Sequence, residues 1–403
     1  MTAVALIGIS HKSTPASDRE RFHLTPEDAA AVSRSLADGR SESVVLATCN
    51  RTEIYVAARD IVCALERARR TLVDLGDGTL PATAIYAFGG QQAAAHLFRV
   101  AAGLESVVLG DTHVAAQVRR AHHLARLAGS TGALLDRLFE AASAASKRVR
   151  SQTSLSRGPT SIPAAAIAAA CRVSSPLADR RLLIVGAGRV ARVAALNAAR
   201  RGCCDIVIAN RTLARGQALA AQVSGRAVAL DELEPELLAA DIVVSATGAR
   251  GFILTAKHTQ VIREHRARRQ LVIFDLALPR DVDPEFRRLP ATRLCALDDL
   301  APMAANSGPQ RRADLTHAGA IAAEEATRYE GWRCARAAAP VIAALHDNAE
   351  QTRRQVLARH ASQLARLTPA EQGLVETVSA QLVAALLHGP TLALRRQTQE
   401  RAA

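Results

Sequence analysis

The chain has 403 residues, more than one ordinary hydrophobic core supports, so two or three domains are predicted. Although 49% of the residues are apolar, no apolar run is long and uninterrupted enough to predict a membrane span. The net charge of +13 would suit a polyanion such as RNA. However, nearly all of it is arginine in an alanine-rich chain with 3% aromatic residues, so charge alone does not define a nucleic-acid binder.

The cysteines are too irregularly spaced for a metal site or a disulfide framework. There are seven, with no CxxC pair, and Cys203 and Cys204 are adjacent. We therefore expect free thiols and a cytoplasmic location.

The first 150 residues alternate short strands with helices. Strands are predicted at 4–9, 43–48 and 52–58, and helices at 25–37 and 61–75. The helix at 25–37 has a threonine cap followed by a proline, a typical helix start. From 91 to 149 the apolar spacing is helical, with turns near Gly110 and at 129–132. This pattern predicts an α+β sandwich followed by a helical half.

A polar segment at 147–161, which contains Gly-Pro, is predicted to link this region to the next. The sequence RLLIVGAGRVARVAALNAARRGCCDIVIANRT then has the order strand, glycine turn, helix, strand, which opens a Rossmann domain. Segments 240–249 and 270–283 are predicted to add buried parallel strands.

The chain after about residue 310 is predicted to be almost entirely helical. The expected breaks are Pro340, Gly373, Gly389 and Pro390. Apolar residues recur at steps of three and four, among them Val356, Leu364, Leu367, Leu374, Val378 and Leu382. Helices of this kind that lack a sheet pack on each other or on a second subunit.

The glycine turn carries a dinucleotide-binding motif made of Gly186, Ala187, Gly188, Arg189, Val190 and Ala191. Gly186 would form the tight turn, Gly188 would admit a pyrophosphate close to the backbone, and Ala191 would let helix and strand approach. The NH groups of the helix N-terminus would face the phosphates. The alternative is a Rossmann-like domain that binds no nucleotide.

The end of the second Rossmann strand indicates which dinucleotide is bound. An NAD site would carry an acidic residue there, but this chain has Asn210, Arg211 and Thr212. A neutral side chain followed by a guanidinium favours the 2′-phosphate of NADP(H). The alternative is an exposed arginine without a ligand.

Cys49 differs from the other cysteines because it lies in a polar turn, TCNRT, between two apolar strands. Arg51 is two residues away, and a nearby cation favours the nucleophilic thiolate. A nucleophilic thiol together with NADPH suggests that a thioester is formed and then reduced to an aldehyde. His96 is a candidate acid or base, although a histidine in its apolar surroundings is more often a core residue.

Several segments, taken together and in order, resemble the glutamyl-tRNA reductase family. They are GISHKSTP at 8–15 followed by Arg19 and Glu20, TCNRTE at 48–53, His96, AGLESVVLGD at 102–111 with Gln117, the glycine turn, NRT, DLALPRD at 275–281 and LLHGPT at 386–391. The resemblance extends from residue 4 to near 395 and involves several independent motifs, so it is specific.

The resemblance implies that Cys49 attacks glutamyl-tRNA and that NADPH reduces the resulting thioester to glutamate-1-semialdehyde. It implies a role for His96 in proton handling, which reverses the local interpretation. The substrate residues implied are Thr48, Asn50, Arg51, Ser106, Asp111, Thr112, His113 and Gln117. The family also implies a homodimer formed by the C-terminal helices and a partner, glutamate-1-semialdehyde aminomutase.

The predicted fold class is therefore α/β multidomain. We expect an N-terminal α+β catalytic domain at 1–155, a Rossmann NADPH-binding domain at 156–305, and a C-terminal all-helical dimerisation domain with a long connecting helix at 306–403.

Three positions depart from the family pattern. Ser10 replaces the usual Asn, Asp111 the usual Glu, and His113 the usual Gln, but neither the nucleophile nor the cofactor motif is lost. One alternative is an NADP-dependent reductase of a free carbonyl, akin to shikimate dehydrogenase, which would need a Lys–Asp pair in a chain with lysine only at 12, 147 and 257. The other is a non-catalytic NADPH-binding regulator that recruits tRNA.

Overall fold

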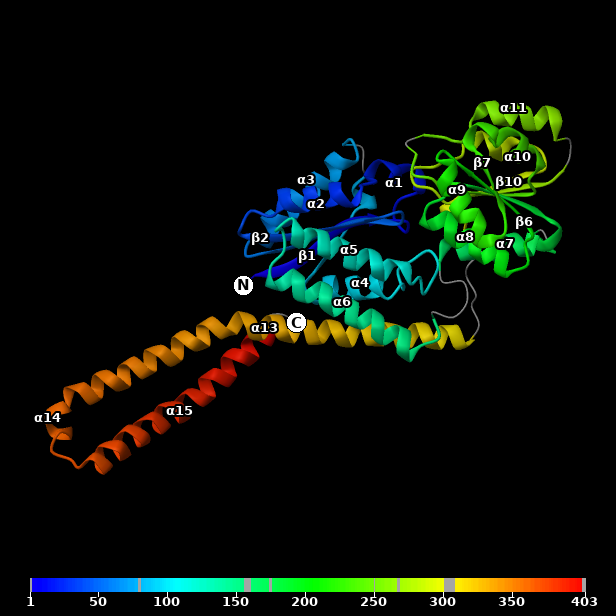
Figure 1. Ribbon diagram of the computed structural model, residues 1–403. Coiled ribbons are helices and arrows are strands. Elements are labelled where there is room, and N and C mark those ends of the chain that lie inside the picture. The colour runs from blue at the N-terminus through cyan, green and yellow to red at the C-terminus, as the bar shows by residue number, and fades with distance from the viewer. Residues whose placement is uncertain are drawn as a thin grey trace.

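The computed structural model describes residues 2–78, 81–155, 161–173, 176–249, 251–266, 269–300 and 309–400. Figure 1 shows an N-terminal sheet with helices on both faces, a second sheet-based unit beside it, and a long helical hairpin that projects away from both. This architecture confirms the predicted α/β multidomain fold class.

The N-terminal unit is built on an antiparallel sheet with strand order β2-β3-β1-β4. Its elements are β1 (Ala3–Ser10), α1 (Ala16–Arg19), α2 (Pro26–Leu36), β2 (Ser41–Thr48), β3 (Arg51–Ala58), α3 (Ile61–Leu75), β4 (Tyr86–Gly89), α4 (Gly90–Ala101), α5 (His113–Leu127) and α6 (Ala133–Gln152). Because side chains alternate along a strand, Ile7 and Ile54 face α2 and α3, while Leu6 and Tyr55 face α4 and α6. The predicted strands and helices are confirmed, and β4 is an additional strand.

The polar segment around Cys49 is the turn of a β-hairpin. Strands β2 and β3 pair in a register that places Thr48 opposite Arg51, so Cys49 and Asn50 form a two-residue turn. The Thr48 hydroxyl accepts hydrogen bonds from the backbone NH of Asn50 and of Arg51, each at 3.2 Å. The strand–turn–strand prediction is therefore confirmed.

The prediction of a linker at 147–161 was wrong for residues 147–152, because α6 continues to Gln152. Val149 is buried and continues the apolar face of α6, so the polar residues around it only form the solvent side of the helix. The next helix, α7, already begins at Ile162, and residues 156–160 lie outside the described part of the chain.

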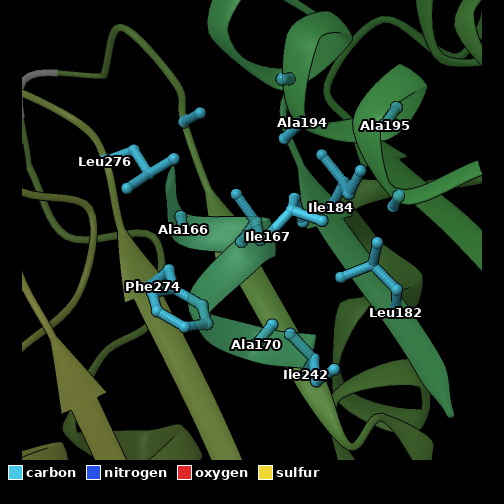
Figure 2. Packing of buried hydrophobic residues seen from close by; sticks show 14 of the residues in the cluster. Ala166, Ile167, Ala170, Leu182, Ile184, Ala194, Ala195, Ile242, Phe274 and Leu276 are labelled. Carbon is cyan, nitrogen blue, oxygen red and sulfur yellow. The ribbon is translucent and has the colours of Figure 1, made fainter. Parts of the chain in front are cut away.

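The second unit is a Rossmann domain with a parallel sheet of order β10-β9-β8-β5-β6-β7. Its elements are α7 (Ile162–Val173), β5 (Arg181–Val185), α8 (Arg189–Arg200), β6 (Asp205–Asn210), α9 (Leu213–Ala220), β7 (Arg226–Ala229), α10 (Leu233–Ala239), β8 (Ile242–Ser245), α11 (Ala256–His265), β9 (Leu271–Asp275) and β10 (Thr292–Cys295). In Figure 2, Ile167 and Ala170 of α7 pack against Leu182, Ile242 and Phe274 of this sheet. The predicted strand, glycine turn, helix and strand are confirmed.

The Rossmann domain packs directly on the N-terminal unit. Val107 and Val108 of the N-terminal unit belong to the hydrophobic cluster of the Rossmann domain, and Cys49 packs against that cluster. This contact places the β2–β3 turn at the boundary between the two units.

The C-terminal part is a helical hairpin made of α13 (Pro309–Arg359), α14 (Ala361–Leu364) and α15 (Pro369–Glu400). The first part of α13 packs on α4 and α6, where the Tyr329 hydroxyl donates to the carbonyl oxygen of Leu134 at 3.1 Å. The rest of α13 leaves the body alongside α15 (Figure 1).

The predicted helix breaks were wrong. Pro340 lies inside α13, and Gly373, Gly389 and Pro390 lie inside α15. The chain reverses instead around α14, near residues 360–368. A proline removes one backbone hydrogen bond, and the alanine-rich turns beside Pro340 retain a high helix propensity.

Helix α15 carries an exposed apolar stripe. Leu374, Val378, Leu382 and Leu386 recur every four residues and are between 54% and 67% exposed. In the described part of the chain, Pro369–Leu394 is also the one segment that is long and apolar enough to cross a membrane. A stripe on one side of a helix fits a helical partner better than lipid, which would contact the whole circumference.

Candidate active site

A cavity lies between the N-terminal unit and the Rossmann domain. On the N-terminal side it is lined by Thr48, Cys49, Asn50, Arg51, Ser106, Asp111, His113, Val114 and Gln117. On the Rossmann side it is lined by Ser161, Ile162, Pro163, Arg189, Val190, Val193, Leu276 and Leu297. The structure thus brings the predicted nucleophile and the start of the predicted cofactor helix into one site.

Cys49 lies at this boundary as a half-buried residue. Burial among protein atoms, followed by the negative charge of Asp111, raises the pKa of the Cys49 thiol to about 11. The cations Arg19 and Arg51 lower this pKa, but burial outweighs them. Arg51 therefore favours the thiolate, as predicted, but its effect is smaller than that of burial, because the sequence does not reveal how strongly a group is desolvated.

Arg51 is held by a buried carboxylate behind the cavity wall. Arg51 is only 3% exposed. Its Nη1 donates to Oε1 of Glu53 at 2.8 Å, and its Nη2 donates to the carbonyl oxygen of Glu105. Glu53 is fully buried and also accepts from Tyr55 Oη at 2.6 Å and Tyr86 Oη at 2.7 Å. The guanidinium is thereby fixed in one orientation at the edge of the cavity.

The same carboxylate binds His96. The Nε2 atom of His96 lies 2.8 Å from Oε1 of Glu53, and the imidazole packs against the rings of Tyr86 and Phe88. Burial raises the pKa of Glu53, but the charge of Arg51 and hydrogen bonds from His96 outweigh it, so this pKa lies well below its usual value. Glu53 therefore remains ionised between two cationic or hydrogen-bonding partners.

His96 and Thr112 are the two predicted substrate or catalytic residues that are not among the described residues lining the cavity. His96 and Arg51 both bind Oε1 of Glu53. Thr112 directly precedes α5. In this arrangement His96 contacts the site through Glu53 and Arg51 rather than facing Cys49.

Asp111 and His113 come from the loop that leads into α5. The backbone NH of His113 donates to Oδ1 of Asp111 at 2.8 Å, which fixes the carboxylate at the start of the helix. Burial raises the pKa of Asp111, while the NH of His113 opposes this shift. Gly110 has φ +81°, and a Cβ there would lie 2.3 Å from the carbonyl oxygen of Leu155, so this loop requires glycine.

The glycine turn has the geometry that a dinucleotide needs. Gly186 has φ +108°, and a Cβ on it would lie 2.6 Å from the carbonyl oxygen of Ala246. Gly188 precedes the first turn of α8, and a Cβ built there would meet nothing within 4 Å, so the approach to the helix NH groups is open. Ala191 is fully buried against the sheet. These residues fit a pyrophosphate group.

Asn210, Arg211 and Thr212 lie at the end of β6, outside the cavity lining among the described residues. The Asn210 amide donates to the carbonyl oxygen of Thr212 at 2.8 Å, and Arg211 is exposed. Strand β6 is the neighbour of β5, so the NRT turn lies beside the glycine turn, where the adenosine end of a dinucleotide would bind.

Sequence reasoning missed two groups of residues. The first is the apolar wall from the Rossmann domain, including Leu276 and Leu297, which only the docking of the two units brings to the site. The second is Glu53. A signal for Glu53 was present, because it is a carboxylate two residues after Arg51 and therefore on the same face of an otherwise apolar strand.

The fold and the site define an oxidoreductase of three parts, with a thiol-bearing domain, an NADP-type Rossmann domain and a helical hairpin. Residues 7–153 match the glutamyl-tRNA reductase N-terminal domain, 168–303 match shikimate/quinate 5-dehydrogenase, and 317–403 match the glutamyl-tRNA reductase dimerisation domain. The chain belongs to the glutamyl-tRNA reductase family.

Two full-length relatives, each more than 30% identical, support this assignment. The glutamyl-tRNA reductase of Syntrophotalea carbinolica is 34% identical over 396 residues, covering 97% of this chain and 89% of the relative. That of Myxococcus xanthus is 35% identical over 390 residues, covering 96% of this chain and 88% of the relative. A solved glutamyl-tRNA reductase from Methanopyrus kandleri aligns over 98% of both chains, with 28% identity and a TM-score of 0.49.

Proposed function

We propose that this chain reduces glutamyl-tRNA to glutamate-1-semialdehyde with NADPH, the first step of five-carbon tetrapyrrole biosynthesis, through a thioester on Cys49. The observation that carries the proposal is the shared cavity, which is lined both by Cys49 and by Arg189 and Val190 of the cofactor turn. A thiol and a dinucleotide site that open into the same space suit a reaction in which an acyl group bound to sulfur accepts a hydride.

In the first step the sulfur of Cys49 attacks the ester carbonyl, a C–S bond forms, and the C–O bond to the tRNA breaks. The thiol is protonated near neutral pH, so its proton must move to another group as the bond forms. Asp111 and His113 are the lining side chains that can accept it. The released tRNA hydroxyl takes up a proton.

Thr48, Asn50 and Arg51 are proposed to hold the glutamyl group, together with Ser106 and Gln117. Arg51 is fixed by Glu53, so its guanidinium can meet a carboxylate without reorganising. The Oδ1 atom of Asn50 is buried without a hydrogen-bond partner at the cavity wall, which leaves it able to accept from the substrate amino group.

NADPH, when bound at the glycine turn, supplies the hydride. Leu276 and Leu297 keep water from the space beside Cys49, which protects a thioester from hydrolysis. Hydride adds to the acyl carbon, the C–S bond breaks to release the aldehyde, and the sulfur of Cys49 takes back the proton that it gave up during acylation.

The experiment that tests the proposal is to incubate the protein with glutamyl-tRNA in the absence of NADPH. We expect a glutamyl mass on the peptide that contains Cys49 and its loss, with aldehyde formation, when NADPH is added. Acylation of a different cysteine, or none, would contradict the mechanism.

The match of 168–303 to shikimate/quinate 5-dehydrogenase keeps a free-carbonyl reductase as the second candidate. That reaction needs a lysine at the substrate, but none of the three lysines is among the described residues that line the cavity, and the amine of Lys12 pairs with Glu105. Oxidation of NADPH by shikimate-like ketones with the Cys49→Ser variant would favour this candidate.

We further propose that the protein acts as a cytoplasmic homodimer and passes its unstable aldehyde to a glutamate-1-semialdehyde aminomutase. The apolar stripe on α15 and the match to the dimerisation domain support self-association. Leu382→Asp should convert the dimer to a monomer in analytical ultracentrifugation, while the neighbouring exposed change Gln381→Asp should not.

A further inference from the structure

Two adjacent residues, Arg19 and Glu20, were singled out by the sequence but have no part in the mechanism above. Arg19 ends α1 and is 2% exposed. Its Nη2 donates to Oδ1 of Asp298 at 2.9 Å, and the same carboxylate accepts from the backbone NH of Ala16 at 2.8 Å. Asp298 belongs to the Rossmann domain, so this contact joins the two units that form the cavity.

Glu20 makes a second contact of the same kind with the opposite polarity. Its Oε1 accepts from the backbone NH of Arg280 at 3.0 Å and from Nε of the same residue at 2.5 Å. Arg280 also belongs to the Rossmann domain, in the loop that follows β9. Arg19 therefore pairs with Asp298 on one Rossmann loop, and Glu20 pairs with Arg280 on another. Because the two pairs have opposite polarity, only one docking position of the two units satisfies both.

Each of the two Rossmann loops also supplies one apolar residue of the cavity wall. Leu297 directly precedes Asp298, and Leu276 opens the loop that contains Arg280. A shift of either ion pair would therefore move a residue that lies beside the reacting atoms.

Arg19 in addition contacts the nucleophile turn. Its Nε donates to the carbonyl oxygen of Cys49 at 3.3 Å, and its Nη1 donates to the carbonyl oxygen of Thr14 at 2.6 Å. One buried guanidinium thus binds the backbone of the nucleophile with one nitrogen and the Rossmann domain with another.

We propose that Arg19 and Glu20 are positioning residues that dock the Rossmann domain over Cys49 through Asp298 and Arg280 for the reductive half of the reaction. The inference rests on the proposed function for its chemistry. It predicts that the two halves of the reaction respond differently to loss of the ion pairs, since acylation by glutamyl-tRNA needs no hydride donor.

The test uses the full-length variants Asp298→Asn, Glu20→Arg, Arg280→Glu and the double reversal Glu20→Arg/Arg280→Glu. Acylation of Cys49 without NADPH should be at least as fast as in wild type, because looser docking does not bury the thiol further, while single-turnover NADPH oxidation by the acyl-enzyme should fall by about tenfold or more in the single variants. The double reversal should recover most of the lost rate, because it restores the pair with exchanged charges.

The matched control is Asp299→Asn. Asp299 forms an exposed ion pair with Arg287, at 2.7 Å, and accepts from the backbone NH of Ala296, at 2.9 Å, both within the Rossmann domain itself. Asparagine keeps an acceptor for that NH, so the substitution should leave both half-reactions unchanged. NADPH affinity measured by fluorescence should equal that of wild type in all variants, which shows that the Rossmann domain is folded.

A second measurement needs no substrate. Looser docking should expose the Cys49 side chain, so its rate of alkylation by iodoacetamide should rise severalfold in Asp298→Asn and Glu20→Arg but not in Asp299→Asn. Wild-type rates of reduction and alkylation in these variants, or equal losses in both half-reactions, would overturn the docking role. Failure of wild type to acylate would instead contradict the proposed function, and alkylation would still decide the docking role.

Discussion

The two walls of the cavity differ in chemistry and in how they are held. The N-terminal wall is polar, and its groups are fixed by hydrogen bonds from the chain behind it, as in the contact of Glu53 with Arg51. The Rossmann wall is mainly apolar, and its residues Leu276 and Leu297 reach the site on two loops that are tied across the interface by ion pairs. The difference suggests that one wall selects and binds the acyl group and the other excludes water and delivers the cofactor.

The largest loss of activity should follow replacement of Cys49, whose sulfur is the reacting atom of the polar wall. Cys49→Ser removes the thiol that forms the thioester, so activity should fall by about 10³-fold or more. The measurement is NADPH oxidation with glutamyl-tRNA, and Cys63→Ser, at an exposed cysteine, is the control. Substantial activity in Cys49→Ser would show that the polar wall binds the substrate but does not supply the nucleophile.

The second prediction concerns how strongly the closed cavity affects the thiol. A rise in the pKa of Cys49 from 9.0 to about 11 means about 100-fold less thiolate at pH 8 than for an ordinary thiol. The thiolate fraction should increase about tenfold for each pH unit between 7 and 10. Iodoacetamide labelling followed by peptide mass analysis checks this against exposed Cys63.

A Cys49 that reacts faster than Cys63 near neutral pH would contradict this prediction. That result would mean that the charges of Arg19 and Arg51 lower the pKa of Cys49 more than burial by the apolar wall raises it.

The third prediction tests whether the polar wall depends on its buried support. Glu53→Gln keeps the shape but removes the negative charge that orients Arg51 and His96, so kcat/KM for glutamyl-tRNA should fall by about 10- to 100-fold. The effect should appear mainly in KM, because Arg51 holds the substrate.

The control is Glu42→Gln, a carboxylate in the same sheet. Glu42 accepts from the backbone NH of Leu134 and of Leu135 at the start of α6 and does not line the cavity among the described residues. Its replacement should lower the melting temperature without changing KM. Equal kinetics in Glu53→Gln and wild type would show that Arg51 needs no support.

The smallest effect should lie at the far end of the cofactor. Arg211→Ala removes the cation proposed to bind the 2′-phosphate, so KM for NADPH should rise about tenfold while KM for NADH should not change. Arg215→Ala, at an exposed position on α9, serves as the control. An equal change for both cofactors would show that Arg211 does not distinguish them.

Much of the polar wall was predictable because its residues are close together in the sequence. Thr48 to Arg51 occupy a single hairpin turn, and Asp111, His113 and Gln117 occupy one loop and the helix that follows it. The contact of His96 with Glu53 was harder to predict from the sequence, because it depends on how α4 crosses the sheet. The breaks predicted at Pro340 and Pro390 failed because the helix-forming residues on either side of each proline outweigh the one backbone hydrogen bond that it removes.

The sequence by itself determined the fold class, the hairpin turn that carries Cys49, the glycine turn and the family, because each depends on residues close in the chain or on motifs in order. Only the tertiary structure decided that the two turns open into one cavity, that burial raises the pKa of Cys49, and that Arg51 is held by Glu53. Those properties arise from desolvation and from contacts between residues far apart in the chain, such as Arg19 and Asp298, which no local pattern encodes.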